Sequence, residues 1–254
     1  MILEILNNYA LIIFLFFVIA ILYSSVGFGG GSSYIAALTL TSLLHTDIKV
    51  IALCCNIVVV TGNVWKYYQN TCLNWYKVIP LTIISIPASF LGGYILLKQE
   101  LFFIILGCTL LIAAVSMWFS KQIALKTYQT NNAQNKNIFF GGVIGFISGM
   151  VGIGGGIFLA PLLHLTNWDT SKRIAATASF FILVNSLAGI LGQLSSTKVQ
   201  LNYPLLITLL LTVIIGGQLG SSITNNYFTP NQLKKATALL IAFVSVRILL
   251  KYLY

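Results

Sequence analysis

Apolar runs separated by short polar stretches follow one another from one end of the chain to the other. At a rise of 1.5 Å per residue, a helix of about 20 residues crosses a hydrocarbon core of about 30 Å, and many of these runs approach that length. We expect helical segments at 9–26, 32–44, 48–68, 75–97 and 101–120, and again at 138–151, 157–165, 175–194, 201–223 and 233–253. The pattern predicts an all-α, polytopic integral membrane protein.

The most polar stretch of the chain, residues 121–137, divides this pattern into two sets of segments. It contains Lys121, Lys126 and Lys136 with repeated Asn and Gln, and it has no apolar period. We therefore expect a first transmembrane unit at 1–120, a polar linker at 121–137 and a second transmembrane unit at 138–254. The first apolar run has no Lys or Arg before it and no clear cleavage site after it, so we expect it to be retained rather than removed as a signal peptide.

The two units repeat one another in sequence, which indicates an internally duplicated fold. Val26–Gly31 (VGFGGG) matches Val151–Gly156 (VGIGGG) at a shift of 125 residues. Weaker matches follow in the same order and at similar spacing: Lys49–Ala52 with Arg173–Ala176, Asn74-Trp75 with Asn202-Tyr203, and Phe90–Gly92 with Gln218–Gly220. Preserved order and spacing are not expected from chance composition.

Each unit begins with a helix pair broken by glycines and continues with three longer apolar segments. If the broken pair returns to its own side or crosses twice, the two units are inverted; if it is a single broken span, they are parallel. Inverted repeats place nine basic residues on one face, namely Lys66, Lys77, Lys121, Lys126, Lys136, Lys172, Arg173, Lys234 and Lys235, and five on the other, namely Lys49, Lys98, Lys198, Arg247 and Lys251. Parallel repeats give eight against six. The positive-inside rule favours the inverted arrangement, with a cytoplasmic linker and both termini outside.

The two glycine breaks are the strongest candidates for a solute site. Non-helical backbone at membrane depth is tolerated only inside protein or beside a water-filled cavity. A helix that begins just after a break presents unpaired amides and the positive end of its dipole, which suit an anion. The candidate substrate-binding residues are therefore Gly27, Gly29, Gly30, Gly31, Ser32 and Ser33 in the first unit, and Gly152, Gly154, Gly155, Gly156 and Ile157 in the second.

Glycines can also serve only the close packing of helices. Gly141, Gly145 and Gly149, and likewise Gly216 and Gly220, have the four-residue spacing typical of a packing face. We expect packing at these spaced glycines, and the same role is the alternative for the two breaks.

Polar side chains inside apolar runs are the next candidates, because amides and hydroxyls can replace the hydration shell of a solute. Asn56 and Asn185 form the preferred pair, since each lies in the helix that follows a broken pair. Other residues have the same character: Thr61, Asn63, Thr177, Ser179, Ser186 and Gln218. For each of them, hydrogen bonding between helices is the alternative role.

Charged residues avoid the centres of the apolar runs. The acidic residues all lie at segment ends: Glu4, Asp47, Glu100 and Asp169. No carboxylate is therefore expected at mid-membrane for coupling to protons or sodium ions. If protons are coupled, His45 or His164 is the side chain that can titrate, with a structural role as the alternative. We expect Lys49 and Arg173 to be topological flanks, with attraction of anions at the entrances as the alternative.

Composition agrees with a membrane protein and argues against several other classes. Of 254 residues, 58% are hydrophobic and 7% charged, whereas roughly a quarter are charged in soluble domains. The net charge of +10 comes from basic residues that mostly stand singly, so nucleic-acid binding is not expected. The four cysteines have no metal-ligand or disulfide spacing. The sequence contains no constellation that indicates catalysis, so we expect no catalytic residue, no metal, no cofactor and no enzyme.

The two glycine motifs, their position after an apolar helix and the internal repeat together resemble the sulfite exporter TauE/SafE family of membrane transporters. The resemblance extends from about Leu11 to about Leu249, and its closer match is Gly152–Gly156 followed by Leu159-Ala160-Pro161. The first copy has Ala36 where the second has Pro161. The resemblance implies transport of sulfite, a sulfonate or another small organic anion, without identifying which.

The sequence therefore predicts a secondary transporter of the cytoplasmic membrane that moves a small anionic solute by alternating access between its two units. An anion channel is the alternative, and a membrane-embedded enzyme is a weaker one. Membrane lipids are expected partners and nucleic acid is not. Homo-oligomerisation, the direction of transport and the coupling ion stay open.

Overall fold

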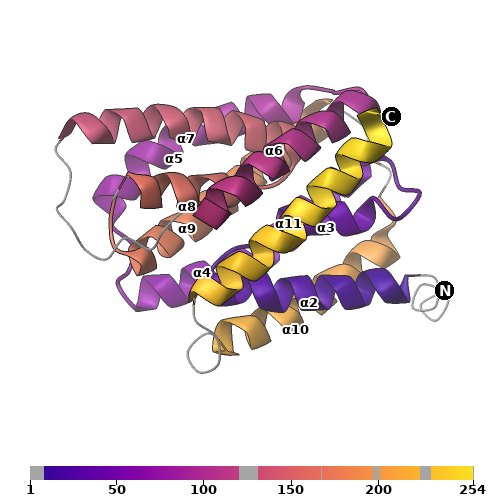
Figure 1. The fold of residues 1–254 in the computed structure, drawn as a ribbon, viewed down its shortest axis with the longest axis horizontal. Coiled ribbons are helices and arrows are strands. Elements are labelled where there is room, and N and C mark those ends of the chain that lie inside the picture. Colours follow the sequence, from indigo (N-terminus) through magenta and orange to yellow (C-terminus); the bar gives the residue numbers. More distant parts are fainter. Residues whose placement is uncertain are drawn as a thin grey trace.

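The computed structural model describes residues 9–119, 131–166, 168–196, 199, 201–223 and 230–253. Every regular element within these ranges is a helix (Figure 1). The first unit contains α2 (Ala10–Val26), α3 (Gly31–Leu38), α4 (His45–Gln69), α5 (Trp75–Tyr94) and α6 (Gln99–Phe119). The second contains α7 (Asn131–Val151), α8 (Gly156–Leu165), α9 (Ser171–Ser196), α10 (Tyr203–Ile223) and α11 (Pro230–Leu253). The all-α prediction is confirmed for the described residues. It rests on the rule that backbone at membrane depth must satisfy its hydrogen bonds within helices.

Two helix boundaries differ clearly from the expected ones. α7 begins at Asn131 rather than at 138, so residues 131–137 are helical instead of belonging to the linker. Their polar side chains concealed them from hydropathy, and residues 121–130 of the expected linker lie outside the described residues. α3 ends at Leu38 rather than at 44, because Thr39 and Thr41 donate side-chain hydrogen bonds of 2.7 and 2.6 Å to carbonyl oxygens three residues earlier. Such bonds compete with continuation of a helix.

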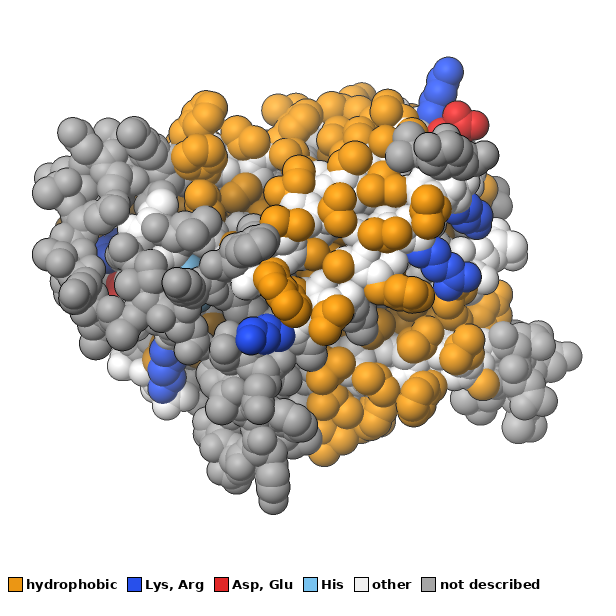
Figure 2. Space-filling view, viewed as in Figure 1, with side chains coloured by type: hydrophobic (Ala, Val, Ile, Leu, Met, Phe, Trp, Pro, Cys, Tyr) orange, Lys and Arg blue, Asp and Glu red, His pale blue; other side chains and the backbone are white. Residues whose placement is uncertain are grey.

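The surface of the molecule suits a bilayer. Four described helices are long and apolar enough to cross a membrane: His45–Gln69, Trp75–Tyr94, Lys172–Ser196 and Tyr203–Ser222. Figure 2 shows an apolar surface over the middle of the molecule, with Lys and Arg side chains toward its ends. Large apolar side chains such as Phe139 and Phe243 are mostly exposed. Apolar exposure of this extent is favourable in lipid and unfavourable in water.

The helices pair across the two halves of the chain. α2 packs along α10, α7 along α5, α6 along α11 and α4 against α9. Spaced glycines make two of these contacts close. A Cβ atom on Gly145 would lie 2.7 Å from the Ser85 carbonyl oxygen, and one on Gly216 would lie 2.8 Å from the Phe17 carbonyl oxygen. The expectation that these glycines serve packing is confirmed.

Helices α5, α7 and α9 run in the same direction. Along α5, Leu81, Ser85 and Ser89 face α7 at Gly141, Gly145 and Gly149, in that order. Ser89 Oγ also donates a hydrogen bond of 2.8 Å to the Asn185 carbonyl oxygen of α9, and Gly93 lies against Gly189. Residue numbers rise together along all three helices, so their starts lie at one end of the molecule.

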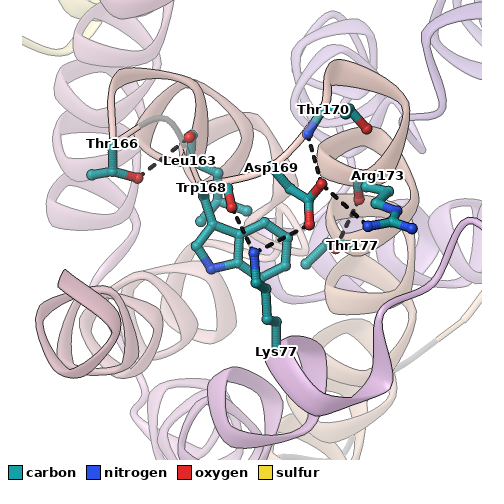
Figure 3. A network of polar contacts seen from close by, with 8 residues as sticks. All are labelled: Lys77, Leu163, Thr166, Trp168, Asp169, Thr170, Arg173 and Thr177. Atoms are coloured by element: carbon teal, nitrogen blue, oxygen red, sulfur yellow. Dashed lines mark hydrogen bonds and ion pairs between the residues drawn. The ribbon is translucent and has the colours of Figure 1, made fainter. Parts of the chain in front are cut away.

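A charged cluster joins the beginnings of α5 and α9 (Figure 3). Lys77 Nζ lies 3.3 Å from Asp169 Oδ2 and donates a hydrogen bond of 2.9 Å to the Trp168 carbonyl oxygen. Asp169 Oδ1 lies 3.6 Å from Arg173 Nη1 and accepts a hydrogen bond of 2.8 Å from the Thr170 amide. The Asp169 side chain is fully buried. The cluster holds the corner between α8 and α9 against the first turn of α5.

The two broken pairs begin and return at opposite ends of the molecule. The α7–α8 pair does so where α5 and α9 begin, as the charged cluster shows. The α2–α3 pair begins and returns at the other end of the molecule. α2 runs parallel to α10. The start of α4 lies beyond the end of α5, where His45 Nε2 is 3.1 Å from the Leu97 carbonyl oxygen. In Figure 1, α2 begins and α11 ends at the right, whereas α7 begins at the left.

Candidate functional site

Each glycine break is a short non-helical stretch between two helices. α2 ends at Val26 and α3 begins at Gly31, whereas α7 ends at Val151 and α8 begins at Gly156. Backbone φ angles between 80° and 89° occur at Gly27, Gly30, Gly152, Gly154 and Gly155. Residues with a Cβ atom rarely adopt this left-handed conformation, so the breaks need glycine at these positions.

The two breaks meet at the Asn56 side chain of α4, which is completely buried. Asn56 Nδ2 donates a hydrogen bond of 2.8 Å to the Ile153 carbonyl oxygen of the second break. An added Cβ atom on Gly31 of the first break would overlap Asn56 Nδ2 and lie 2.8 Å from the same Ile153 oxygen. On Gly154 it would lie 3.0 Å from Asn56 Nδ2. One amide side chain therefore touches both halves of the candidate site.

Unpartnered polar side chains surround this meeting point. Among the described residues, four buried oxygen atoms next to the breaks have no hydrogen-bond partner: Asn56 Oδ1, Ser148 Oγ, Ser186 Oγ and the Tyr34 hydroxyl. A Cβ on Gly154 would lie 2.8 Å from Ser186 Oγ, one on Gly155 3.1 Å from Ser148 Oγ, and one on Gly30 3.1 Å from Tyr34 Cζ. An unsatisfied buried polar group costs about 1–3 kcal/mol, so several at one place suggest a ligand that would satisfy them.

Two helices begin at this meeting point. In α3 the Tyr34 amide bonds the Gly30 carbonyl oxygen at 2.9 Å, and in α8 the Phe158 and Leu159 amides bond that of Gly155 at 3.1 Å. The amides that precede these bonds are the unpaired first amides of each helix. Because Gly31 lies against Ile153, the positive dipole ends of α3 and α8 come together. This arrangement can hold a negative charge.

The predicted serines of the first break contact α2. The Tyr23 hydroxyl lies 2.8 Å from Ser33 Oγ and 3.4 Å from Ser32 Oγ. Gly27, in turn, accepts a hydrogen bond from Ser179 Oγ of α9 at its carbonyl oxygen. In the second break, Gly156 packs against Ile182 of α9, and Ile157 is buried. The structure therefore brings the glycines together and gives Ser32 and Ser33 a bonding partner within their own unit.

Asn56 and Asn185, the preferred amide pair, are not bonded to one another. Asn185 Nδ2 donates hydrogen bonds to Ser85 Oγ at 3.0 Å and to the Phe181 carbonyl oxygen at 2.8 Å. Asn185 therefore joins α9 to α5. Its neighbour Ser186 faces Gly154 instead, because consecutive helical residues are about 100° apart around the axis.

Sequence reasoning left Ser148, Tyr34 and Lys49 out of the candidate binding set. Ser148 lies one helical turn before Gly152, and that spacing could have identified it as a neighbour of the break. Lys49 was expected to be a flank, but it is only 4% exposed. Arg173, which matches Lys49 in the sequence comparison of the two units, has a side chain that is 44% exposed and pairs with Asp169.

The described residues do not gather any group of three His, Cys, Asp or Glu side chains as a metal site would require. The two histidines lie apart from one another in the chain, with His45 in the first turn of α4 and His164 in the last turn of α8. The polar groups at the breaks are hydroxyls, amides and backbone N–H groups. Such groups can bind a solute.

Comparison with known proteins gives a consistent picture. The profile of the family described as "Sulfite exporter TauE/SafE" matches residues 12–248. A "probable membrane transporter protein" of Sinorhizobium fredii is 33% identical over 92% of this chain and 95% of its own length. Proteins with the same description from Methanocaldococcus jannaschii and Bacillus subtilis are 26% and 24% identical over 88% and 81% of this chain, and over 89% and 85% of their own lengths. No solved structure gives a significant match.

Proposed function

Because the chain belongs to the sulfite exporter TauE/SafE family of membrane transporters, we propose that it carries a small anion across the cytoplasmic membrane and binds it where the two glycine breaks meet at Asn56. The observation that carries this proposal is the convergence of two helix starts and several unpartnered hydroxyl groups at one buried place. Hydroxyl and amide donors around two positive dipole ends favour a negative ligand.

A small oxyanion fits the donors of this site. Each of its oxygen atoms accepts hydrogen bonds, so one anion can satisfy the first amides of α3 and α8 together with Ser148 Oγ and Ser186 Oγ. The acidic residues of the described part of the chain stand elsewhere: Asp47 and Glu100 lie in the first turns of α4 and α6, and Asp169 precedes α9. Sulfite or a sulfonate is the anion class that the family name suggests.

The mechanism proposed is alternating access between two inverted repeats. Positive-φ glycines recur at a shift of 125 residues, and the broken helix of each unit packs along the fourth helix of the other, α2 on α10 and α7 on α5. The broken pairs also begin and return at opposite ends. These relations support a carrier in which one unit rocks against the other around a fixed site. A channel, the alternative, would provide a continuous path instead.

Transport in proteoliposomes tests the proposal. Purified protein should take up labelled sulfite or a labelled sulfonate with saturation, and unlabelled anion trapped inside should accelerate that uptake by exchange. Flux that does not saturate, together with single-channel currents, would contradict the carrier mechanism. Absence of flux for sulfite, sulfonates and carboxylates alike would contradict the anion assignment.

Replacement of Ser186 by alanine tests the location of the site. Ser186 Oγ has no hydrogen-bond partner among the described residues, so Ser186→Ala should leave the melting temperature unchanged or raise it. If Ser186 donates to the anion, the affinity should fall about tenfold to a hundredfold, as expected for one hydrogen bond to a charged group. Ser245→Ala is the matched control, because Ser245 is also fully buried but bonds its own helix at Ala242. Equal affinities in both variants would place the anion elsewhere.

A further inference from the structure

Lys49 is a buried cation that has no counter-ion among the residues that the structure describes. It is 4% exposed, although it lies in a helix that is long and apolar enough to cross a membrane. Within the described part of the chain it forms no ion pair, whereas Lys77 and Arg173 both pair with Asp169. Lys49 Nζ lies over the Phe102 ring, 6.0 Å from the ring centroid. A buried charge that lacks a partner is costly, so its retention requires a reason.

The stem of Lys49 packs against the second glycine break. A Cβ atom on Gly152 would lie 3.0 Å from Lys49 Cγ and 3.2 Å from Lys49 Cβ. Gly152 therefore gives the lysine room as well as supplying a left-handed turn. Asn56 follows Lys49 by two turns of α4, about 10 Å along the axis, and bonds Ile153 next to Gly152. Both side chains of α4 thus meet the same break.

Topological anchoring does not explain this lysine. A lysine that fixes the position of a helix extends its ammonium group to the interface, where water solvates it. Lys98, at the same end of the molecule, behaves in this way and is exposed. Arg173, the counterpart of Lys49 in the repeat, is 44% exposed and neutralised by Asp169. The two units therefore differ at this position: Arg173 is partly exposed and paired, whereas Lys49 is buried and has no ion-pair partner in the described part of the chain.

A second polar group lies beside the same aromatic ring. His45, one turn before Lys49, has its ring centroid 5.5 Å from that of Phe102. His45 Nε2 contacts the Leu97 carbonyl oxygen, and the buried Nδ1 has no partner in the described residues. Phe102 of α6 thus lies against the first turns of α4, close to both the lysine and the histidine.

We propose that Lys49 supplies the positive charge that selects an anion at the glycine-break site, and that its ligand is a small soluble oxyanion rather than a neutral solute. This inference rests on the proposed function. The hydroxyls and amides near Asn56 would hold the oxygens of the anion, while the Lys49 ammonium, whose stem lies against Gly152, would balance its charge. The ligand would then supply the counter-ion that Lys49 lacks among the described residues.

Thermal stabilisation by anions in detergent tests the proposal on the folded protein. The probes are sodium sulfite, sodium ethanesulfonate and sodium acetate, each against sodium gluconate at equal ionic strength, with phosphatidylglycerol added in a separate arm. A ligand at a hundredfold excess over its Kd should raise the melting temperature of the unmodified protein by about 5 °C or more. The same measurement is made on Lys49→Met, Lys49→Arg and the exposed control Lys98→Met.

We expect Lys49→Met to bind the anion at least tenfold more weakly, so that the shift falls to about half or less at the same concentration. Lys49→Arg should keep most of the shift, and Lys98→Met should keep all of it. Lys49→Met should still fold, because removal of an unpaired buried charge relieves a desolvation cost; Lys49→Gln serves the same comparison if it does not.

Three other outcomes would overturn the inference in distinguishable ways. If Lys49→Met responds like the unmodified protein, Lys49 does not bind the anion, while the proposed function stands. If no soluble anion stabilises the unmodified protein, the anion site itself falls and the role of Lys49 falls with it. If phosphatidylglycerol alone stabilises it and Lys49→Met abolishes that response, Lys49 is a lipid contact.

Discussion

Glycine has two distinct roles in this chain, and the surroundings of each glycine separate them. At the breaks, a Cβ atom is excluded for two reasons: the φ angles are positive, and neighbouring side chains occupy the space. Within the long helices, some glycines touch the backbone of another helix, whereas Gly217 has its nearest foreign atoms at 3.5 Å or more. The cost of adding a methyl group should therefore vary strongly from one glycine to the next.

Gly155→Ala should destabilise the protein and weaken anion binding. Its φ of +80° costs an alanine about 1–2 kcal/mol, and the new Cβ atom would lie 2.8 Å from Phe181 Cε1 and 3.1 Å from Ser148 Oγ. We expect a loss of about 2 kcal/mol in stability together with a reduced anion response. Melting curves in detergent, with and without sulfite, measure both.

Gly217→Ala is the control for that substitution. Gly217 lies inside α10 with Val59 atoms at 3.5, 3.6 and 3.8 Å from the added Cβ atom, which is ordinary contact. Alanine is favoured over glycine in a helix by up to about 1 kcal/mol, so the melting temperature should stay the same or rise. If Gly155→Ala is tolerated equally well, the break does not need its left-handed backbone.

At this scale the sequence predicts backbone features better than side-chain partners. The clustered glycines predicted both breaks, because few other backbone conformations require Gly-x-Gly-Gly-Gly inside an apolar run. The direction of Asn185 toward Ser85 depends on the rotation of α9, which its nearly uniform apolar pattern does not fix. Likewise, the burial of Lys49 depends on Gly152, 103 positions away in the chain.

Helix α5 is the element on which the second unit packs. It lies between α7 and α9, and the small residues Ser85, Ser89, Gly92 and Gly93 let both helices approach its backbone. Without a hydrophobic driving force between helices in lipid, such close contacts and interhelical hydrogen bonds supply most of the association energy. The charged cluster of Lys77, Asp169 and Arg173 adds an ionic contact at one end of this packing.

Asp169→Asn should loosen the junction between α5 and α9. The buried Asp169 carboxylate serves Lys77, Arg173 and the Thr170 amide, and asparagine can replace the last of these contacts but not the charge. Because Lys77 and Arg173 are partly exposed, we expect a cost of about 1–3 kcal/mol rather than that of a fully buried pair. Thermal unfolding in detergent at low and high salt measures this cost.

Lys172→Gln is the matched change for that experiment. Lys172 precedes Arg173 in the same turn, carries the same charge and is exposed. Its loss should change the free energy of unfolding by no more than about 0.5 kcal/mol, so the melting temperature should hardly move. If the Asp169→Asn protein has the same melting temperature as the Lys172→Gln protein, the cluster contributes nothing to the stability of the junction.

The positions of most helices along the chain could be predicted from the sequence, whereas the contacts between helices could not. The apolar runs located the helices, while the polar start of α7 escaped because hydropathy detects lipid contact rather than helix formation. Lys77 was expected on the same face as Arg173 from charge counting alone. Its ion pair with Asp169 could not be foreseen, because the two residues are 92 positions apart and are brought together only by the corner between α8 and α9.

At the scale of the whole molecule, the contacts at the two ends of α5 show which charged residues lie at opposite ends of the molecule. α5 begins beside Asp169 and ends close to His45, at opposite ends of the molecule. Lys172, next to the charged cluster, and Lys98, next to Leu97, therefore lie at opposite ends as well. Inverted repeats predict this separation, whereas parallel repeats place Lys98 and Lys172 on one side of the membrane.

Labelling of single cysteines in cells tests the arrangement. In a protein whose Cys54, Cys55, Cys72 and Cys108 are replaced by alanine, a membrane-impermeant maleimide should label Lys98→Cys in intact cells and Lys172→Cys only after permeabilisation. The assignment of sides follows from the nine-to-five distribution of basic residues, since the richer face stays in the cytoplasm. Both lysines are exposed, so access to the reagent does not depend on unfolding. Labelling of both cysteines from the same side would contradict inverted repeats, and labelling of Lys172→Cys alone in intact cells would keep the repeats but reverse their orientation.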